Sequence, residues 1–165
     1  MTAINKNRLP VGLKFKNPLN IKRDVNNHWL GKDEKNLVVL EKFNSFFFGF
    51  RAGFKMIRKA VRWRGCNTLR KLLMKWTPEQ ENGQEIMMQH IYFVASHLDI
   101  SPDARLDYRN KALMCELVYW IMIFESGHAE CVIEDDYRGR HYVIGYPNGM
   151  KKLIEKSYDL VAKEG

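Results

Sequence analysis

Long apolar runs are missing from this chain. No stretch approaches the roughly 20 apolar residues that a membrane-spanning helix needs, so we do not expect an integral membrane protein. The opening residues, MTAINKNRLP, lack the apolar centre of a secretory signal peptide. We therefore expect synthesis in the cytoplasm. If the protein acts in the periplasm or cell wall, another component must carry it there.

Cysteine is scarce as well. The three cysteines, Cys66, Cys115 and Cys131, form no Cys-x-x-Cys pair and cannot all be bridged. This excludes a complete disulfide framework and favours a reduced, intracellular environment. The five histidines show no paired ligand spacing, and no cysteine or acid completes a set with His90 and His97. We predict neither a metal nor another cofactor.

The composition is that of one globular domain, and basic residues outnumber acidic ones. Hydrophobic residues make up 45% of the 165 positions and charged residues 28%. A net charge of +8 favours anionic partners, such as nucleic acid, anionic lipid or a cell-wall polymer. Six basic residues crowd one face of a predicted helix: Arg51, Lys55, Arg58, Lys59, Arg62 and Arg64. Such faces are usually solvated, so nucleic-acid binding ranks third among our functional hypotheses.

Hydrophobic spacing predicts a mostly helical α+β domain spanning residues 1–165. We expect a flexible N-terminus over 1–11 and a strand over 36–43. Ile86 and Trp76 are predicted to be buried in their helices. Alternating residues around DDYRGR predict a small antiparallel β-hairpin over 129–146. The predicted helices cover roughly 49–64, 68–76, 84–98, 107–125 and 148–164.

A carboxylate closes the most apolar of these helices. Glu125 follows Ile121 by four residues and Leu117 by eight, on the face that those residues bury. Loss of hydration there should raise its pKa, as a general acid for glycoside cleavage requires. Alternatively, Glu125 simply reaches solvent past the helix end. Further carboxylates, Glu134, Asp135 and Asp136, follow in the hairpin.

The hairpin sequence DYRGRHYVIG (136–145) resembles the Asp-x-x-Gly…Thr-Ile-Gly pattern of phage-type lysozymes, in which a helix-ending Glu precedes it. The resemblance implies Glu125 as the acid, and Asp136, Glu134 or Asp135 as the group that stabilises the oxocarbenium-like centre or activates water. Gly139 and Val143 would border the substrate. Val143 stands where the pattern has Thr, so His141 would have to position water instead. The Glu-to-Asp spacing is also longer by two.

A longer resemblance joins several segments of the chain. They are GLKFKNPLNIKRDVNNHWLG (12–31), FNSFFFGFRAGFKMIRK (43–59), GCNTLRKLLMKWTPEQEN (65–82) and FESG (124–127). Their order resembles a family of small phage and prophage virion-associated proteins over about 115 residues. Members of that family are usually described as virion structural proteins, and many look lysozyme-like.

This resemblance implies a glycan cleft. The Asn-Pro-x-Asn-Ile segment is similar to the cleft-lining segment of bacterial N-acetylglucosaminidases, although Phe15, Lys16 and Leu19 depart from the family pattern. Carried over by position, the residues that bind substrate would be Asn17, Asn20, Ile21, Trp29, Glu81 and Asn82.

The order of these parts differs from that in ordinary lysozyme-like enzymes, where the catalytic Glu precedes the cleft-lining turn. Here Glu125 follows it by about a hundred residues, as a circular permutation would produce. We therefore expect residues 17–21 to approach Glu125. The leading hypothesis is a lysozyme-like glycosidase acting on peptidoglycan strands, delivered by a phage or secretion-system component. The alternative is a non-catalytic virion or cell-wall-binding protein with the same fold.

Overall fold

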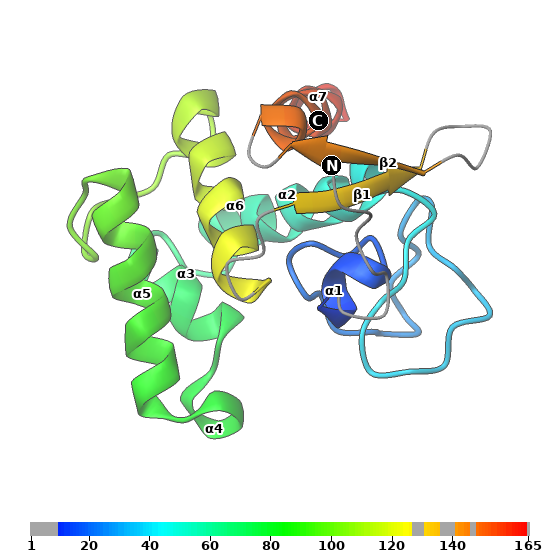
Figure 1. The fold of residues 1–165 in the computed structure, drawn as a ribbon. Helices are drawn as coiled ribbons and strands as arrows, with labels where there is room; N and C mark the ends of the chain where they lie inside the picture. Colours follow the sequence, from blue (N-terminus) through cyan, green and yellow to red (C-terminus); the bar gives the residue numbers. More distant parts are fainter. Residues whose placement is uncertain (1–9, 127–130, 136–140, 146–147, 165) are drawn as a thin grey trace.

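The computed structural model describes residues 10–126, 131–135, 141–145 and 148–164, and shows a mostly helical single domain (Figure 1). Most of the expected flexible N-terminus lies outside these residues, and Val11 already begins a helix. The described residues form seven helices: α1 (Val11–Lys14), α2 (Phe46–Trp63), α3 (Leu69–Trp76), α4 (Glu79–Asn82), α5 (Gln84–Leu98), α6 (Lys111–Glu125) and α7 (Asn148–Lys163).

Capping side chains set where the main helices begin. Ser45, Thr68 and Asn110 each accept a hydrogen bond from a backbone N–H in the first turn of α2, α3 and α6. Consequently α2 begins three residues before the predicted 49, and α6 begins at Lys111 rather than near 107. The predicted break over 77–83 contains the short helix α4, which ends at Asn82 and is followed by Gly83 with φ +83°.

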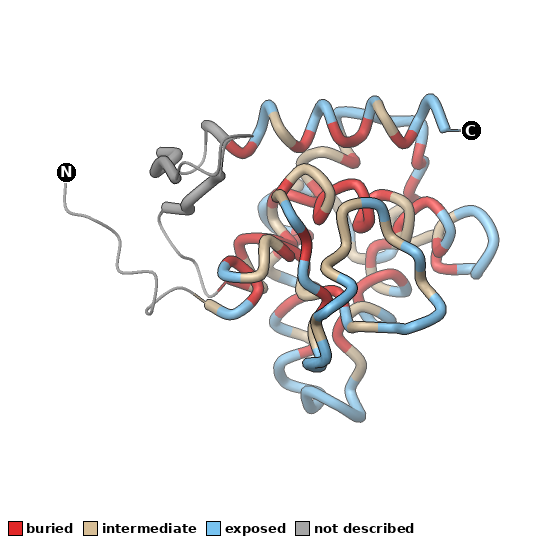
Figure 2. Tube along the Cα trace, turned by 90° about the vertical axis from the view of Figure 1, so that its right-hand side faces the viewer, coloured by how far each residue is buried: buried red, intermediate tan, exposed pale blue. Residues whose placement is uncertain are grey.

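The core is formed mainly by α2, α3, α5, α6 and α7. Helix α2 packs along α7, while α6 contacts both α5 and α7. Figure 2 shows the buried side of α7 facing the rest of the molecule. Because α6 is covered on several sides, seven of its residues are buried. The largest fully buried side chains include Phe46, Phe50, Phe54, Leu72, Ile91, Leu117 and Ile121.

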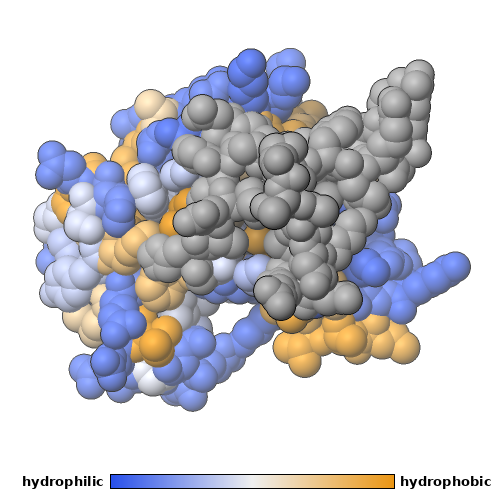
Figure 3. All heavy atoms as spheres, viewed as in Figure 1, coloured by the Kyte–Doolittle hydropathy of each residue, from blue (hydrophilic) through white to orange (hydrophobic). Residues whose placement is uncertain are grey.

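The predicted strand over 36–43 is wrong. In the described residues, this part of the chain makes isolated bridges only, Lys22 with Leu40 and Lys32 with Phe43. The Asn36 side chain donates to the Leu40 carbonyl at 2.7 Å, which closes a turn where a strand would be extended. Figure 3 shows apolar atoms at the lower right, where Figure 1 places the long α1–α2 loop. Its exposed apolar residues are Val25, Leu30, Leu37, Val38 and Val39.

Two residues of the basic face of α2 are used inside the molecule. Arg51 and Arg58 are each only 8% exposed. Arg51 makes two hydrogen bonds with the Glu164 carboxylate, at 3.0 and 2.7 Å, and Arg58 donates to the Val161 carbonyl at 2.7 Å. Both partners belong to the C-terminal end of the chain, so these residues fasten α2 to α7. Lys59, Arg62 and Arg64 of the same face remain exposed, so only part of the predicted basic face is available to an anionic partner.

Two strands follow α6. Strand β1 (Cys131–Asp135) pairs antiparallel with β2 (His141–Gly145), with Cys131 opposite Gly145 and Asp135 opposite His141. The turn between them and the side chains of both strands lie outside the described residues. Among the helices that the structure describes, none is long and apolar enough to cross a membrane.

Candidate functional site

The Asn-Pro-Leu-Asn-Ile segment forms a tight turn that its first asparagine holds together. The amide of Asn17 donates to the carbonyls of Ile21, at 2.8 Å, and Glu41, at 2.9 Å, and its oxygen accepts from the Ile21 N–H at 2.9 Å. Asn17 is fully buried, so it positions the turn and does not face a ligand. The turn lies tightly on α2, because a Cβ at Gly49 would come within 2.3 Å of the Lys16 carbonyl oxygen.

The turn presents Asn20 to Glu125, 105 positions away along the chain. Nδ2 of Asn20 lies 2.8 Å from Oε2 of Glu125 and 3.3 Å from its backbone oxygen. The expected approach of residues 17–21 to Glu125 is therefore present. Glu125 is half-buried at the end of α6. Burial raises the pKa of its carboxyl, and hydrogen bonds from Asn20 and Thr77 offset part of that rise.

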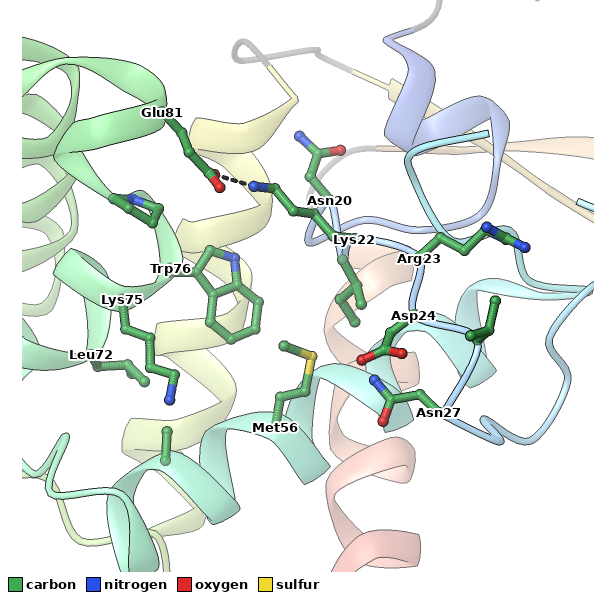
Figure 4. Close-up of a pocket in the computed structure, with 14 residues that line it drawn as sticks. Asn20, Lys22, Arg23, Asp24, Asn27, Met56, Leu72, Lys75, Trp76 and Glu81 are labelled. Carbon is green, nitrogen blue, oxygen red and sulfur yellow. Dashed lines mark hydrogen bonds and ion pairs between the residues drawn. The ribbon is translucent and has the colours of Figure 1, made fainter. Parts of the chain in front are cut away.

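A cleft of about 650 Å³ begins beside Asn20 and runs between the 20–27 segment and helices α2 and α3 (Figure 4). Trp76, Met56 and Leu72 form its apolar wall, while Lys22, Arg23 and Lys75 bring positive charge. Lys22 forms an ion pair with Glu81 across its upper end. A cleft with an aromatic wall and polar, basic edges suits a sugar chain that carries carboxylates.

Trp76 is the cleft residue that sequence spacing placed in the core. Its indole is only partly buried, lines the cleft, and donates from Nε1 to the Leu19 carbonyl at 3.1 Å. Trp76 lies in the last turn of α3, directly before Thr77-Pro78. This position is the signal in the sequence that could have identified it as a residue at a helix end. Ile86, also predicted to be buried, is 42% exposed because it lies on the outer face of α5.

The other predicted binding residues divide between the cleft and positions away from it. Ile21 lines the cleft floor and is 3% exposed, and Glu81 lines the upper end. Asn82 is exposed and donates back to the Pro78 carbonyl at 3.3 Å, outside the cleft lining. Trp29 packs against the core, and it too is absent from the lining.

The side chains of the predicted site residues in the hairpin cannot be placed relative to Glu125. Asp136 and Gly139 lie outside the described residues, and so do the side chains of Glu134, Asp135, His141 and Val143. Within the part of the chain that the structure describes, no group of three or more His, Cys, Asp or Glu side chains could hold a metal ion.

No family model matches the chain. It is similar to a bacteriophage protein. Over 99 residues it is 33% identical to Protein P5 of Pseudoalteromonas phage PM2, and the alignment covers 58% of this chain. The chain spans 60% of the length of that relative. This similarity to a phage protein agrees with the resemblance to phage proteins found in the sequence, and it extends no further than that.

Proposed function

We propose that this chain is a phage-type, virion-associated protein that binds the glycan strands of peptidoglycan in the cleft beside Asn20, and that Glu125 cleaves them. The observation that carries the proposal is the contact between Asn20, which lines the cleft, and the half-buried Glu125 carboxyl. A lysozyme-like fold with permuted order and a catalytic hairpin belongs to the same proposal.

Cleavage would follow ordinary glycosidase chemistry. Glu125 holds its proton to higher pH than an exposed glutamate does, because it is desolvated. It would give that proton to the leaving glycosidic oxygen, while a second carboxylate stabilises the developing positive charge or activates water. Asp136, Glu134 and Asp135 are the candidates for this second role. Carboxyl groups about 5 Å apart would retain configuration, and a separation of about 6.5–9.5 Å would invert it.

Binding without cleavage is the second candidate function. It is favoured by the similarity to a phage protein, and by Val143 standing where the lysozyme pattern has a hydroxyl. Glu81, one of the two carboxylates that line the cleft together with Asp24, is already paired with Lys22. Such a protein would keep the glycan-binding cleft as a virion component and lack the chemistry.

One experiment separates these functions. Purified peptidoglycan sacculi are incubated with the wild type, Glu125→Gln and Glu155→Gln, and both co-sedimentation and solubilised glycan are measured. Glutamine keeps an oxygen acceptor for Asn20 but cannot supply the proton, and Glu155 is exposed on α7, away from the cleft. We expect binding by all three proteins, with glycan release at least about 100-fold lower for Glu125→Gln alone. Binding without release by any variant would assign the non-catalytic function, and absence of binding would refute both.

A further inference from the structure

A buried ion pair lies inside the long α1–α2 loop, which forms one wall of the cleft. Nζ of Lys32 is 3.8 Å from Oε2 of Glu41, and the two side chains are 6% and 0% exposed. Neither carboxylate oxygen of Glu41 accepts a hydrogen bond from the part of the chain that the structure describes. Burial raises the pKa of this carboxyl, and the charge of Lys32 offsets part of that rise. Burying two charges costs free energy, so the contacts that the cation makes with its surroundings are what such a pair contributes.

The Lys32 ammonium holds the backbone of the 24–27 segment. It donates to the carbonyl of Asn27 at 2.9 Å and to that of Asp24 at 3.3 Å. The segment is folded on itself as well, because the N–H groups of Asn26 and Asn27 donate to the Asp24 side chain and carbonyl, at 2.9 and 3.2 Å. Two carbonyls and a carboxylate around one positive charge are the surroundings of a bound cation. Here that cation is tethered covalently, at the end of a lysine side chain.

The segment that Lys32 holds faces the cleft. Asp24, Val25 and Asn27 line it, and Figure 4 shows the side chains of Asp24 and Asn27 across the cleft from Trp76. A carboxylate and an amide can bond sugar hydroxyl and acetamido groups, while an indole packs on a sugar ring. The position of the 24–27 segment therefore sets the distance between the polar wall of the cleft and its aromatic wall.

Glu41 connects the same ion pair to the turn that carries Asn20. Its N–H donates to the Ile21 carbonyl at 2.9 Å, and its own carbonyl accepts from the Asn17 amide at 2.9 Å. Ile21 directly follows Asn20, where the cleft begins. Glu41 thus joins the Asn20 end of the cleft, through its backbone, to the 24–27 wall, through its charged side chain.

We propose that Lys32 is a positioning residue for ligand binding: its ammonium holds the 24–27 wall of the cleft in the conformation that binds glycan, and Glu41 supplies the buried counter-charge. The part that concerns glycan rests on the proposed function, whereas the hold on the wall does not. The two charges have different tasks, because Lys32 is the one that bonds the wall. Removing Glu41 leaves those two hydrogen bonds in place, and removing Lys32 abolishes both.

Four variants of the full chain separate positioning from stability: Lys32→Met, Glu41→Gln, the double variant with both changes, and Lys35→Met as a control. Lys35 is an exposed lysine of the same loop and lies outside the cleft lining. Urea unfolding gives stability, NMR hydrogen exchange of the Asn27 amide reports on the wall, and calorimetry measures binding of a chitin oligosaccharide. This probe is uncharged, so a change in net charge does not itself alter its affinity.

Stability and binding should respond differently. Each single change in the pair leaves one buried charge without its partner and lowers stability, while the double variant, with neither charge, regains most of the loss. Binding should be weaker by about tenfold or more in Lys32→Met and in the double variant, and within about threefold of wild type in Glu41→Gln. Exchange of the Asn27 amide should be faster in the two variants that lack Lys32. Lys35→Met should match the wild type throughout.

Two results would refute positioning by Lys32: wild-type affinity in the double variant, and unchanged exchange at Asn27 in folded Lys32→Met. If both variants that lack Lys32 are unfolded, the Nζ protons of Lys32 in the wild type decide, since slow exchange with solvent supports the hold and fast exchange refutes it. Faster Asn27 exchange in Lys32→Met, with no oligosaccharide binding even by the wild type, would refute the proposed function and leave the hold on the wall standing. Binding that Lys32→Met does not weaken would do the reverse.

Discussion

Asn20 combines an unusual backbone conformation with the central contact of the site. Its φ is +52°, in the left-handed region that glycine adopts without strain. Asn20→Gly therefore removes the amide and leaves the turn geometry accessible. We expect the pKa of Glu125 to rise further, since a donor that stabilises the ionised carboxylate is lost. Carboxyl ¹³C NMR measures this directly.

A matched control exists on another element. Asp99, at the end of α5, also has a left-handed φ, +53°, and Asp99→Gly removes an exposed side chain outside the cleft. It should leave the Glu125 titration unchanged. If both variants shift Glu125 alike, or neither does, the Asn20 contact does not set its protonation.

His90 should make folding stability depend on pH. Burial lowers its pKa to about 4, from an ordinary value of 6.5. The unfolded chain therefore takes up a proton at this residue before the folded chain does. The free energy of unfolding should fall between pH 6.5 and pH 4, by on the order of 3 kcal/mol from this group.

The contribution of His90 to the pH dependence of stability is isolated by comparing the wild type with a variant that lacks His90. Glu125 acts in the opposite sense, because its raised pKa contributes stability at low pH that is lost as pH rises through the folded pKa. Urea unfolding is therefore compared between the wild type and His90→Phe, which keeps a ring against Phe124. The free energy of unfolding of the wild type minus that of His90→Phe should decrease as pH falls. Replacing the exposed His97 by glutamine should keep the wild-type profile, and a pH-independent difference for His90→Phe would contradict the assignment.

At the scale of elements, periodicity and capping residues account for what could be predicted. Helix α5 matches its predicted span, 84–98, because Gly83 and the turn at Asp99 bound a regular apolar pattern. The loop before α2 could not be predicted this way. Leu37, Val38 and Val39 have strand-like side chains, but side-chain bonds such as Asn36 to Leu40 bend the backbone. Lys32 and Glu41 escaped notice because a loop has no periodicity that could reveal their contact.

The α2–α7 contact gives a prediction at this scale. The Glu164 carboxylate forms ion pairs with Arg51 and Lys55, and these cations lower the pKa of that carboxyl. Glu164→Gln leaves the buried Arg51 guanidinium without its charged partner, so we expect a loss of about 1–2 kcal/mol in unfolding free energy, less than for a fully buried pair. Urea titration measures it. Glu155→Gln, on an exposed part of α7, should cost under about 0.5 kcal/mol, and equal effects would show that the ion pair does not fasten the helices.

For the whole molecule, charge and cleft should make separable contributions to binding. A net charge of +8 attracts an anionic polymer over a distance that salt shortens, from about 10 Å at 0.1 M to about 3 Å at 1 M. We expect co-sedimentation with sacculi to weaken several-fold between low and high NaCl. Binding to chitin, which is uncharged, should change little.

Two charge-reversal variants test whether the attraction to the polymer arises in the cleft. Lys75→Glu and Lys152→Glu change the net charge equally, but Lys75 lines the cleft whereas Lys152 is exposed on α7. If the glycan lies in the cleft, Lys75→Glu weakens sacculus binding several-fold more than Lys152→Glu, because a charge acts most strongly at close range. Equal losses would mean that the overall charge alone holds the polymer. The cleft beside Asn20 would then not be where the glycan binds, and Glu125, which Asn20 contacts, could not act on the glycan there.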